Sequence, residues 1–448
     1  MIMTQSTRIE TILPFYLKGT TVKIPESRVR IGAKAYPAPC VIDAINYMYP
    51  NLYGRVYCEG PPCEAIDTFE LVQHIREYMR RVSKDVTYDM SYADDALSFN
   101  DACTIRWLHG GSSSFTLLMR NESGLFVRKV AVRSGVEGNG SEKLIREHSY
   151  VQNTHLAEYY LPVSELTIDN GLNRVYCDMP FYEGGDMAAA LINGFDTDIL
   201  FSFLETLFTS GFCGSYKSLA ISESRNSFYS NYTHRFENRI NPILDHIEFK
   251  SLLKKGSIHI NGKRYANPAI IMREISTSPG LFEIFKQRVS VPCIHGDLTL
   301  LNMVANDKND IKLIDPRGYA GGFDPLYDLG KLMFSSSGFS SIIKGHVKSR
   351  QRNGVFYVSI YDDRELTAFR SQLMDFIRNN KSLDMMRALE PYFEQRVLLF
   401  EAIHYFADVL FRYHTDKGIE NALSCFLIGT IKLNDLYASV KGKEAAWL

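Results

Sequence analysis

Paired cysteines and long apolar runs are both missing from this 448-residue chain. Its eight cysteines include no CxxC pair, and only Cys58 and Cys63 lie close together. That scatter favours buried free thiols in a reducing compartment over a metal or disulfide framework. The most apolar helical stretch, 397–411, carries three ionisable side chains and is shorter than the ~20 uncharged residues that a membrane span needs. We therefore expect a cytoplasmic protein with no membrane span.

An excess of charge of either sign is also missing. Lys plus Arg number 50 and Asp plus Glu number 51, which gives a net charge of −1. No overall field would then draw the chain onto nucleic acid or an anionic bilayer. The N-terminal segment also lacks the basic stretch and apolar core of a signal peptide. We predict no nucleic-acid partner and expect any bound anion to be held by local groups.

Apolar residues (45%) and charged residues (23%) are close to globular averages, so the chain should pack as two or three domains. Residues 1–100 mix short apolar runs with one helical pattern and are expected to form a small accessory α/β unit. Residues 101–183 alternate as strands around one helix, 141–153. From residue 184 the pattern is mainly helical, interrupted by a hairpin over 257–267 and a mixed block over 291–318. The helices are expected at 186–210, 226–255, 364–379 and 383–440.

The mixed block holds most of the residues suited to chemistry. An aspartate and an amide, Asp297 and Asn302, lie five residues apart in the loop 295–302, which begins HGD. Asp315 follows thirteen residues after Asn302, at the end of an apolar strand. Phosphoryl transfer needs one carboxylate to orient the attacking hydroxyl, and an amide and a second carboxylate to hold Mg²⁺ on the phosphates. The block supplies all three groups.

This block resembles the aminoglycoside phosphotransferase and choline kinase branch of the protein-kinase-like fold. The resemblance covers residues 103–440 and implies an α+β, bilobal fold with a small β-rich N-lobe and a large, mainly helical C-lobe. It implies Asp297 as the catalytic residue beside His295, Asn302 and Asp315 as metal ligands, and ATP and Mg²⁺ as cofactors. A later stretch, 323–330, is similar to the family's GDPxxDLA element, in which Asp328 would brace the catalytic loop.

The N-lobe offers counterparts for the remaining kinase parts. Lys129 lies where the family's lysine neutralises phosphates, and Glu147 in the next helix could pair with it; Arg128 and Glu142 are the rival candidates. The stretch 178–186 resembles the interlobe hinge, with Met179 and Phe181 against the adenine. Backbone N–H groups over the phosphates could come from the loop between two strands, formed by Gly110, Gly111, Ser112 and Ser113.

The family pattern is not matched everywhere. Thr299 stands where many members have His, and Phe323 replaces a glycine. The string IDPRG, residues 314–318, looks most like kinase-like domains attached to sugar nucleotidyltransferases of bacterial capsule and lipopolysaccharide gene clusters. That likeness implies a sugar-like acceptor and partner enzymes of polysaccharide biosynthesis. Arg317 in this string could contact a phosphate or acidic substrate, or form a structural ion pair.

Three functions fit these residues. The leading one is an ATP-dependent phosphotransferase acting on a hydroxyl of a small molecule, a sugar or sugar derivative for surface polysaccharide. The second is a nucleotide-binding pseudokinase that scaffolds such an assembly, and the third is an AMP transferase on the same fold. The segment 55–71 looks like part of a nucleotidyltransferase, but ~100 residues are too few for that domain, so an independent transferase activity is not expected.

Overall fold

The computed structural model describes most of the chain from residue 99 onward and isolated segments before it. The described residues are 21–24, 28–31, 34–37, 41, 44, 55–58, 75, 99–108, 114–132, 140–212, 232–240, 249, 252, 254–291, 294–318, 323–361, 364–413 and 418–441. The helix expected near residues 67–82 and most of the accessory unit lie outside these residues. Within it, β1 (Thr21–Ile24) pairs in parallel with β4 (Arg55–Cys58), and β2 (Arg28–Ile31) pairs with β3 (Lys34–Pro37).

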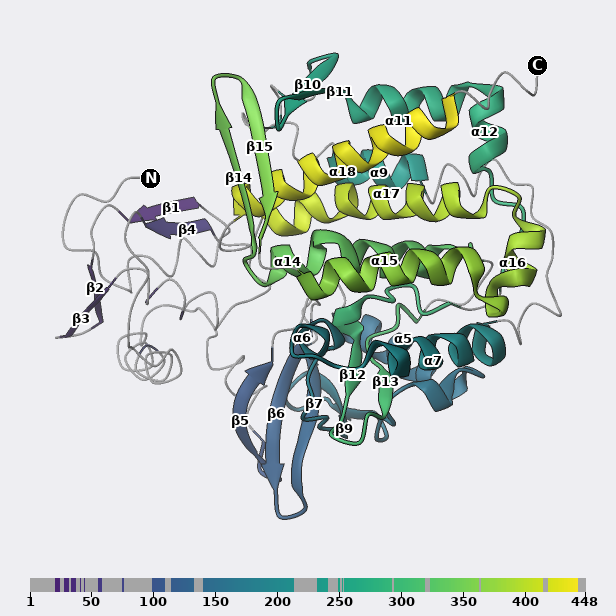
Figure 1. The fold of residues 1–448 in the computed structure, drawn as a ribbon. Helices are drawn as coiled ribbons and strands as arrows, with labels where there is room; N and C mark the ends of the chain where they lie inside the picture. The colour runs from purple at the N-terminus through teal and green to yellow at the C-terminus, as the bar shows by residue number, and fades with distance from the viewer. Residues whose placement is uncertain are drawn as a thin grey trace.

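A five-stranded antiparallel sheet and one helix form the smaller lobe, drawn in blue in Figure 1. The strand order is β5–β6–β7–β9–β8. The elements are β5 (Cys103–Leu108), β6 (Phe115–Asn121), β7 (Gly124–Val132), α5 (Gly140–Asn153), β8 (Thr167–Asp169) and β9 (Arg174–Pro180). Leu144 of α5 packs on Ala131 and Cys177, so the helix covers one face of the sheet.

The larger lobe is mainly helical and is built around α17 and α18, which lie side by side (Figure 1). Its helices are α6 (Met187–Ile192), α7 (Thr197–Thr206), α9 (His234–Ile240), α11 (Pro268–Thr277), α12 (Pro279–Phe285), α13 (Tyr327–Phe334), α14 (Ser340–Ile343), α15 (Arg364–Asn379), α16 (Asp384–Leu389), α17 (Phe393–Tyr413) and α18 (Gly418–Lys441). The prediction of an α+β fold with a small β-rich lobe and a large, mainly helical lobe is confirmed.

Two small sheets complete the larger lobe. The antiparallel pair β12 (Met303–Ala305) and β13 (Ile311–Leu313) lies between the loop 295–302 and Asp315. A four-stranded sheet has the order β11–β10–β15–β14. Its strands are β10 (Ser257–Ile260), β11 (Lys263–Ala266), β14 (Val347–Arg352) and β15 (Val355–Ile360).

The hairpin β14–β15 was not expected from the sequence, although the signal for it is present. Asn353 and Gly354 join the two strands, and both have positive φ, 50° and 76°. Two consecutive residues of positive φ are what a tight two-residue hairpin turn requires, and Asn-Gly is its commonest sequence. The same pair, Asn261 and Gly262, turns the hairpin β10–β11, which was predicted correctly.

Three expected stretches differ in extent from the structure. The strand expected over 160–169 is regular only at Thr167–Asp169. The helical stretch expected over 383–440 is divided into α16, α17 and α18. The helical stretch expected over 186–210 is divided as well: α6 ends at Ile192, Gly194 follows with φ of +87°, and Asp196 caps the start of α7 by accepting a hydrogen bond from Asp198 N. Apolar periodicity continued through this break, which is why the pattern alone did not show it.

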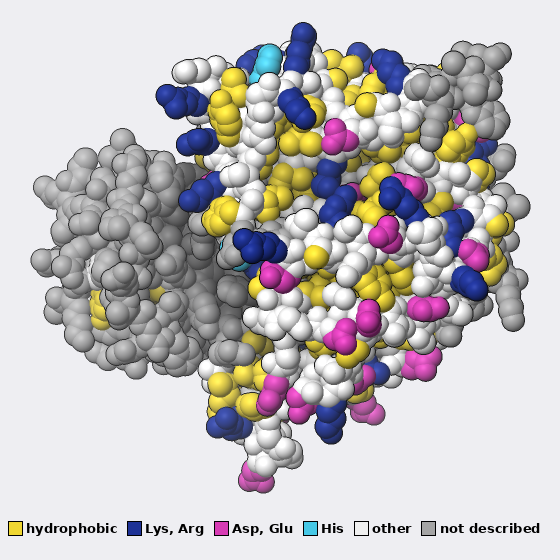
Figure 2. Space-filling model, in the orientation of Figure 1, with side chains coloured by type: hydrophobic (Ala, Val, Ile, Leu, Met, Phe, Trp, Pro, Cys, Tyr) yellow, Lys and Arg dark blue, Asp and Glu magenta, His cyan; other side chains and the backbone are white. Residues whose placement is uncertain are grey.

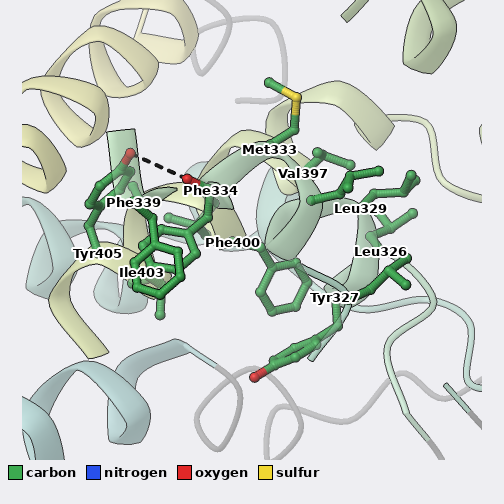
Figure 3. Close-up of a cluster of buried hydrophobic side chains, with 14 of the residues drawn as sticks. Leu326, Tyr327, Leu329, Met333, Phe334, Phe339, Val397, Phe400, Ile403 and Tyr405 are labelled. Atoms are coloured by element: carbon green, nitrogen blue, oxygen red, sulfur yellow. Dashed lines mark hydrogen bonds between the residues drawn. The ribbon is translucent and has the colours of Figure 1, made fainter. Parts of the chain in front are cut away.

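The helices α13 and α17 pack through large side chains at the centre of the larger lobe (Figure 3). Close approach is possible because Gly330 of α13 faces Phe400 of α17: a Cβ at residue 330 would lie 2.3 Å from the Phe400 Cβ. The labelled members of this cluster are Leu326, Tyr327, Leu329, Met333, Phe334, Phe339, Val397, Phe400, Ile403 and Tyr405.

We expect Gly330→Ala to destabilise the fold, because the added methyl group must push two packed helices apart. Overpacking of this kind costs about 1–3 kcal/mol. Thermal or urea unfolding measures the loss, with Gly256→Ala as the control, since a Cβ at residue 256 meets nothing within 4 Å. Equal stability of the two variants would contradict the packing described here.

On the face shown in Figure 2, basic side chains gather over the hairpin β14–β15, where Lys348, Arg350 and Arg352 are exposed. Acidic and basic side chains intermix over much of the remaining coloured surface (Figure 2). In the part of the chain that the structure describes, no helix is both long enough and apolar enough to cross a membrane.

Candidate functional site

Lys129 joins the two lobes at the centre of the predicted site. Its side chain is 3% exposed, and Nζ lies 2.8 Å from Glu147 Oε2 and 2.7 Å from Asp315 Oδ1. Burial alone would lower the pKa of the Lys129 ammonium, but Asp315 and Glu147 outweigh it and hold the pKa above its usual range. One fixed positive charge therefore lies beside the carboxylate that was predicted to bind metal.

The rival strand residue, Arg128, lies on the opposite face of the sheet. Side chains alternate along a strand, so Lys129 and Ala131 face α5 while Arg128 faces away. The Arg128 guanidinium lies 2.7 Å from Asp178 Oδ1 and from Asp101 Oδ2. Arg128 thus ties the segment before β5 to the sheet, and the strand register that was predicted for Lys129 is the one observed.

Helix α5 is fixed against the segment that follows Asp315. Arg146 Nε donates to the Arg317 carbonyl at 3.3 Å. A Cβ at Gly318 would lie 2.9 Å from the Arg146 carbonyl oxygen, so the two backbones are in close contact. Of the two acids left open by the sequence, Glu147 is buried and pairs with Lys129, whereas Glu142 is exposed.

The loop 295–302 presents Asp297 and holds it through Asn302. The Asn302 Nδ2 donates to the Asp297 carbonyl at 2.8 Å and to its Oδ2 at 3.1 Å. With both contacts made through nitrogen, the Oδ1 of Asn302 is left to face elsewhere. Ile314 N donates to the Asn302 carbonyl at 3.0 Å, which brings Asn302 next to Asp315 in the β12–β13 pair.

Asp328 braces this loop as predicted. Its carboxylate accepts hydrogen bonds from the backbone N–H of His295 at 2.7 Å and of Gly296 at 2.9 Å. Gly296 has φ of +78°, and a Cβ there would lie 2.9 Å from Arg317 Cβ, so glycine is required at this position. Burial raises the pKa of Asp328 to about 7, although the backbone donors oppose that shift.

His295 holds the loop through both ring nitrogens. Nε2 lies 2.9 Å from the Ile314 carbonyl, which can only accept, so Nε2 carries the proton. Nδ1 then accepts from Asp297 N at 3.2 Å. Burial lowers the pKa of His295 to about 4, so the ring is neutral at pH 7. This geometry favours a positioning role for His295 over direct catalysis.

Lys331 is a site residue that the sequence analysis missed. Its Nζ lies 2.7 Å from Asp297 Oδ1. Burial alone would raise the pKa of Asp297, but Lys331 and Arg317 outweigh it and hold the pKa below its usual range. The signal was available, because Lys331 follows Asp328 by three residues and so shares its face of α13.

The donor set fits a magnesium ion bound with phosphates. Asp315 has φ of +56°, a left-handed conformation that aims its carboxylate at Lys129. Mg²⁺ is usually held by one or two carboxylates together with substrate phosphates, and Asp315 with the Asn302 Oδ1 could supply the protein's share. Among the described residues, no group of three or more His, Cys, Asp or Glu side chains forms a self-sufficient metal site.

A small open-sided pocket lies beside Lys129 and Glu147. Met179, one of the predicted hinge residues, lines it together with Cys177 and Ile314. The segment predicted as the hinge, 178–186, contacts the larger lobe: Ala305 N donates to the Gly185 carbonyl at 3.3 Å, and Tyr182 Oη donates to Asp310 Oδ2 at 2.6 Å. Phe181, the other predicted hinge residue, is half-buried.

The predicted phosphate loop cannot be placed. Gly110, Gly111, Ser112 and Ser113 lie outside the described residues, so their proposed contact with phosphates stays a prediction. The two strands that flank this loop, β5 and β6, are paired as expected.

Comparisons with known proteins give structural similarity only. No protein-family model and no curated protein matches the chain. A choline kinase from Cryptosporidium parvum Iowa II is similar over 79% of this chain and 91% of its own, with 11% identity and a TM-score of 0.36. A putative fructosamine-3-kinase from Haemophilus somnus 129PT is similar over 77% of this chain and 95% of its own, with 11% identity and a TM-score of 0.41. At this level of similarity they say nothing about the activity or acceptor of this chain.

Proposed function

We propose that this protein is an ATP-dependent phosphotransferase that transfers the γ-phosphoryl group to a hydroxyl of a small molecule. One observation carries the proposal: buried Lys129 bridges Glu147 and Asp315 within a structure that also places Asn302 beside Asp297. The fold alone does not require a lysine that pairs with two acids from different lobes. Nor does it require an aspartate with a left-handed backbone conformation, Asp315, just after strand β13. Phosphoryl transfer needs each of these groups.

The side chains divide the work as follows. Lys129, held by Glu147, neutralises the α- and β-phosphates of ATP. Asn302 and Asp315 hold Mg²⁺, which would neutralise charge on the phosphates during transfer. Asp297 orients the acceptor hydroxyl and takes its proton late in the reaction, because a carboxylate of lowered pKa is a weak base.

The acceptor that we propose is a sugar or sugar derivative destined for bacterial surface polysaccharide, with partner enzymes of that pathway. Support for this finer assignment is the resemblance of residues 314–318 to domains encoded in such gene clusters. The alternatives are a pseudokinase scaffold and an AMP transferase. Nothing in the site favours them over phosphoryl transfer, and one experiment separates all three.

That experiment incubates the protein with candidate sugars and either γ-labelled or α-labelled ATP. We expect label to reach the acceptor, or water as a slow substitute, from γ-labelled ATP only. Transfer of the α-label would instead show an AMP transferase. Tight binding of ATP without transfer of either label to any acceptor or to water would show a pseudokinase.

A further inference from the structure

Positively charged side chains gather around Tyr327 of α13 and Asp297. The Arg235 and Arg317 guanidinium carbons lie 5.4 and 5.3 Å from the ring centroid of Tyr327. Tyr327 is one helical turn before Lys331 on α13 and therefore shares its face. Lys331 in turn contacts Asp297, which links this group of side chains to the loop 295–302.

Two polar atoms of this group lack hydrogen-bond partners in the described part of the chain. The Tyr327 hydroxyl and the Arg235 Nε are both buried, and neither has a hydrogen-bond partner within the described part of the chain. Tyr327 is only 6% exposed, yet its hydroxyl points away from the hydrophobic cluster (Figure 3). Buried polar atoms normally find partners, so an orphaned donor pair beside a reaction centre indicates a ligand that supplies acceptors.

The charge around these atoms is one-sided. Asp297 is the carboxylate whose charge acts on Arg235, while Arg317 and Arg239 add positive charge to its surroundings. Burial is the largest cause that lowers the pKa of the neighbouring His404, and the positive charges of Lys331, Arg235 and Arg317 lower it further. Lys331 pairs with Asp297, and the guanidinium groups of Arg235 and Arg317 lie on the Tyr327 ring close by.

We propose that the acceptor carries an anionic group, a phosphate or a carboxylate, which binds Arg235, Arg317 and the Tyr327 hydroxyl while its free hydroxyl reaches Asp297. This inference rests on the proposed function and narrows its substrate class. Guanidinium groups match phosphate and carboxylate geometry through paired N–H donors. A cationic acceptor such as an amino sugar would be repelled by the same groups.

The test measures binding by calorimetry with the full chain, in the presence of Mg²⁺ and a non-hydrolysable ATP analogue so that anions are kept out of the nucleotide site. The probes are inorganic phosphate, glucose 6-phosphate, glucuronate, glucose and glucosamine. We expect phosphate or at least one anionic sugar to bind, and glucose and glucosamine to bind at least about tenfold more weakly. Glucose 6-phosphate and glucuronate distinguish a phosphate from a carboxylate.

Arg235→Gln should weaken binding of the anionic probe by about ten- to a hundredfold, because a charge-assisted hydrogen bond is lost. Arg235→Lys, which keeps the charge, should restore part of the affinity, a rescue that a merely structural role would not give. Arg378→Gln is the control, since Arg378 pairs with Glu394 on the surface. Thermal melting checks that each variant is folded.

The inference is overturned if no anionic probe binds, if glucose or glucosamine binds as tightly as the anions, or if Arg235→Gln matches the control. Binding of the ATP analogue is recorded separately in the same wild-type samples. If the analogue binds and the anions do not, this inference fails while the phosphotransferase proposal stands. If the analogue does not bind, the phosphotransferase proposal fails first.

Discussion

Asp297→Asn is expected to lower kcat by about 10²–10⁴-fold while leaving MgATP affinity close to that of the wild type. The carboxylate orients the acceptor hydroxyl and receives its proton, so its contribution appears in the transition state and little in the binding of ATP. Asparagine keeps the size of the side chain, but its amide nitrogen cannot accept, so one of the two contacts, from Lys331 Nζ or from Asn302 Nδ2, is lost. The measurement compares steady-state ADP release with nucleotide titration.

The matched control is Asp307→Asn, an exposed aspartate in the turn between β12 and β13. We expect the control to keep wild-type turnover. If Asp297→Asn also keeps wild-type kcat with the true acceptor, the assignment of the catalytic loop is wrong, and so is the phosphotransferase proposal that depends on it.

Lys129→Met should affect both nucleotide binding and stability. Loss of the ammonium removes the anchor for the phosphates, takes from Asp315 its lysine partner, and leaves the almost fully buried Glu147 paired with the partly exposed Lys143. Breaking a buried ion pair by removing one partner typically costs about 3–5 kcal/mol. We therefore expect a lower melting temperature together with at least a tenfold loss of MgATP affinity.

A second variant separates the two effects. Lys129→Met with Glu147→Gln removes one of the two carboxylates that lost Lys129, so it should recover part of the stability without recovering nucleotide affinity. The control is Lys143→Met, because Lys143 also pairs with Glu147, at 3.2 Å, but its side chain is 34% exposed. Normal ATP binding by the double variant would contradict the role proposed for Lys129.

The sequence predicted those parts of the site that are close in the chain or follow a strand pattern. The closeness of Asn302 and Asp315 could be predicted because they flank a short antiparallel pair, β12–β13, which brings the chain back beside Asn302. Lys129 and Arg128 differ only by strand register, and the alternation along β7 places Lys129, not Arg128, against Glu147 and Asp315. Because alternation of apolar and polar side chains marks strands, the strands of the smaller lobe's sheet were nearly all predicted from the sequence.

Contacts between distant helices could not be predicted in the same way. Arg235 on α9 meets Tyr327 on α13 only because both helices pack on α17, and no local pattern encodes that meeting. The hairpin β14–β15 was missed although its Asn353-Gly354 turn was visible, since the surrounding helical periodicity dominated the interpretation. The roles of Gly110 to Ser113 remain predictions, because those residues are not described.

The most direct test of the account is a thermal-shift titration of the wild-type protein with ATP, with and without Mg²⁺. A ligand that binds only the folded state stabilises it by RT ln(1 + [L]/Kd), which is about 2.7 kcal/mol at a hundredfold excess over Kd. We predict a concentration-dependent rise in Tm with ATP, a larger rise when Mg²⁺ is present, and loss of the Mg²⁺ enhancement in Asn302→Ala and Asp315→Ala. An unchanged Tm at millimolar MgATP, or a full Mg²⁺ enhancement in both variants, would contradict the account.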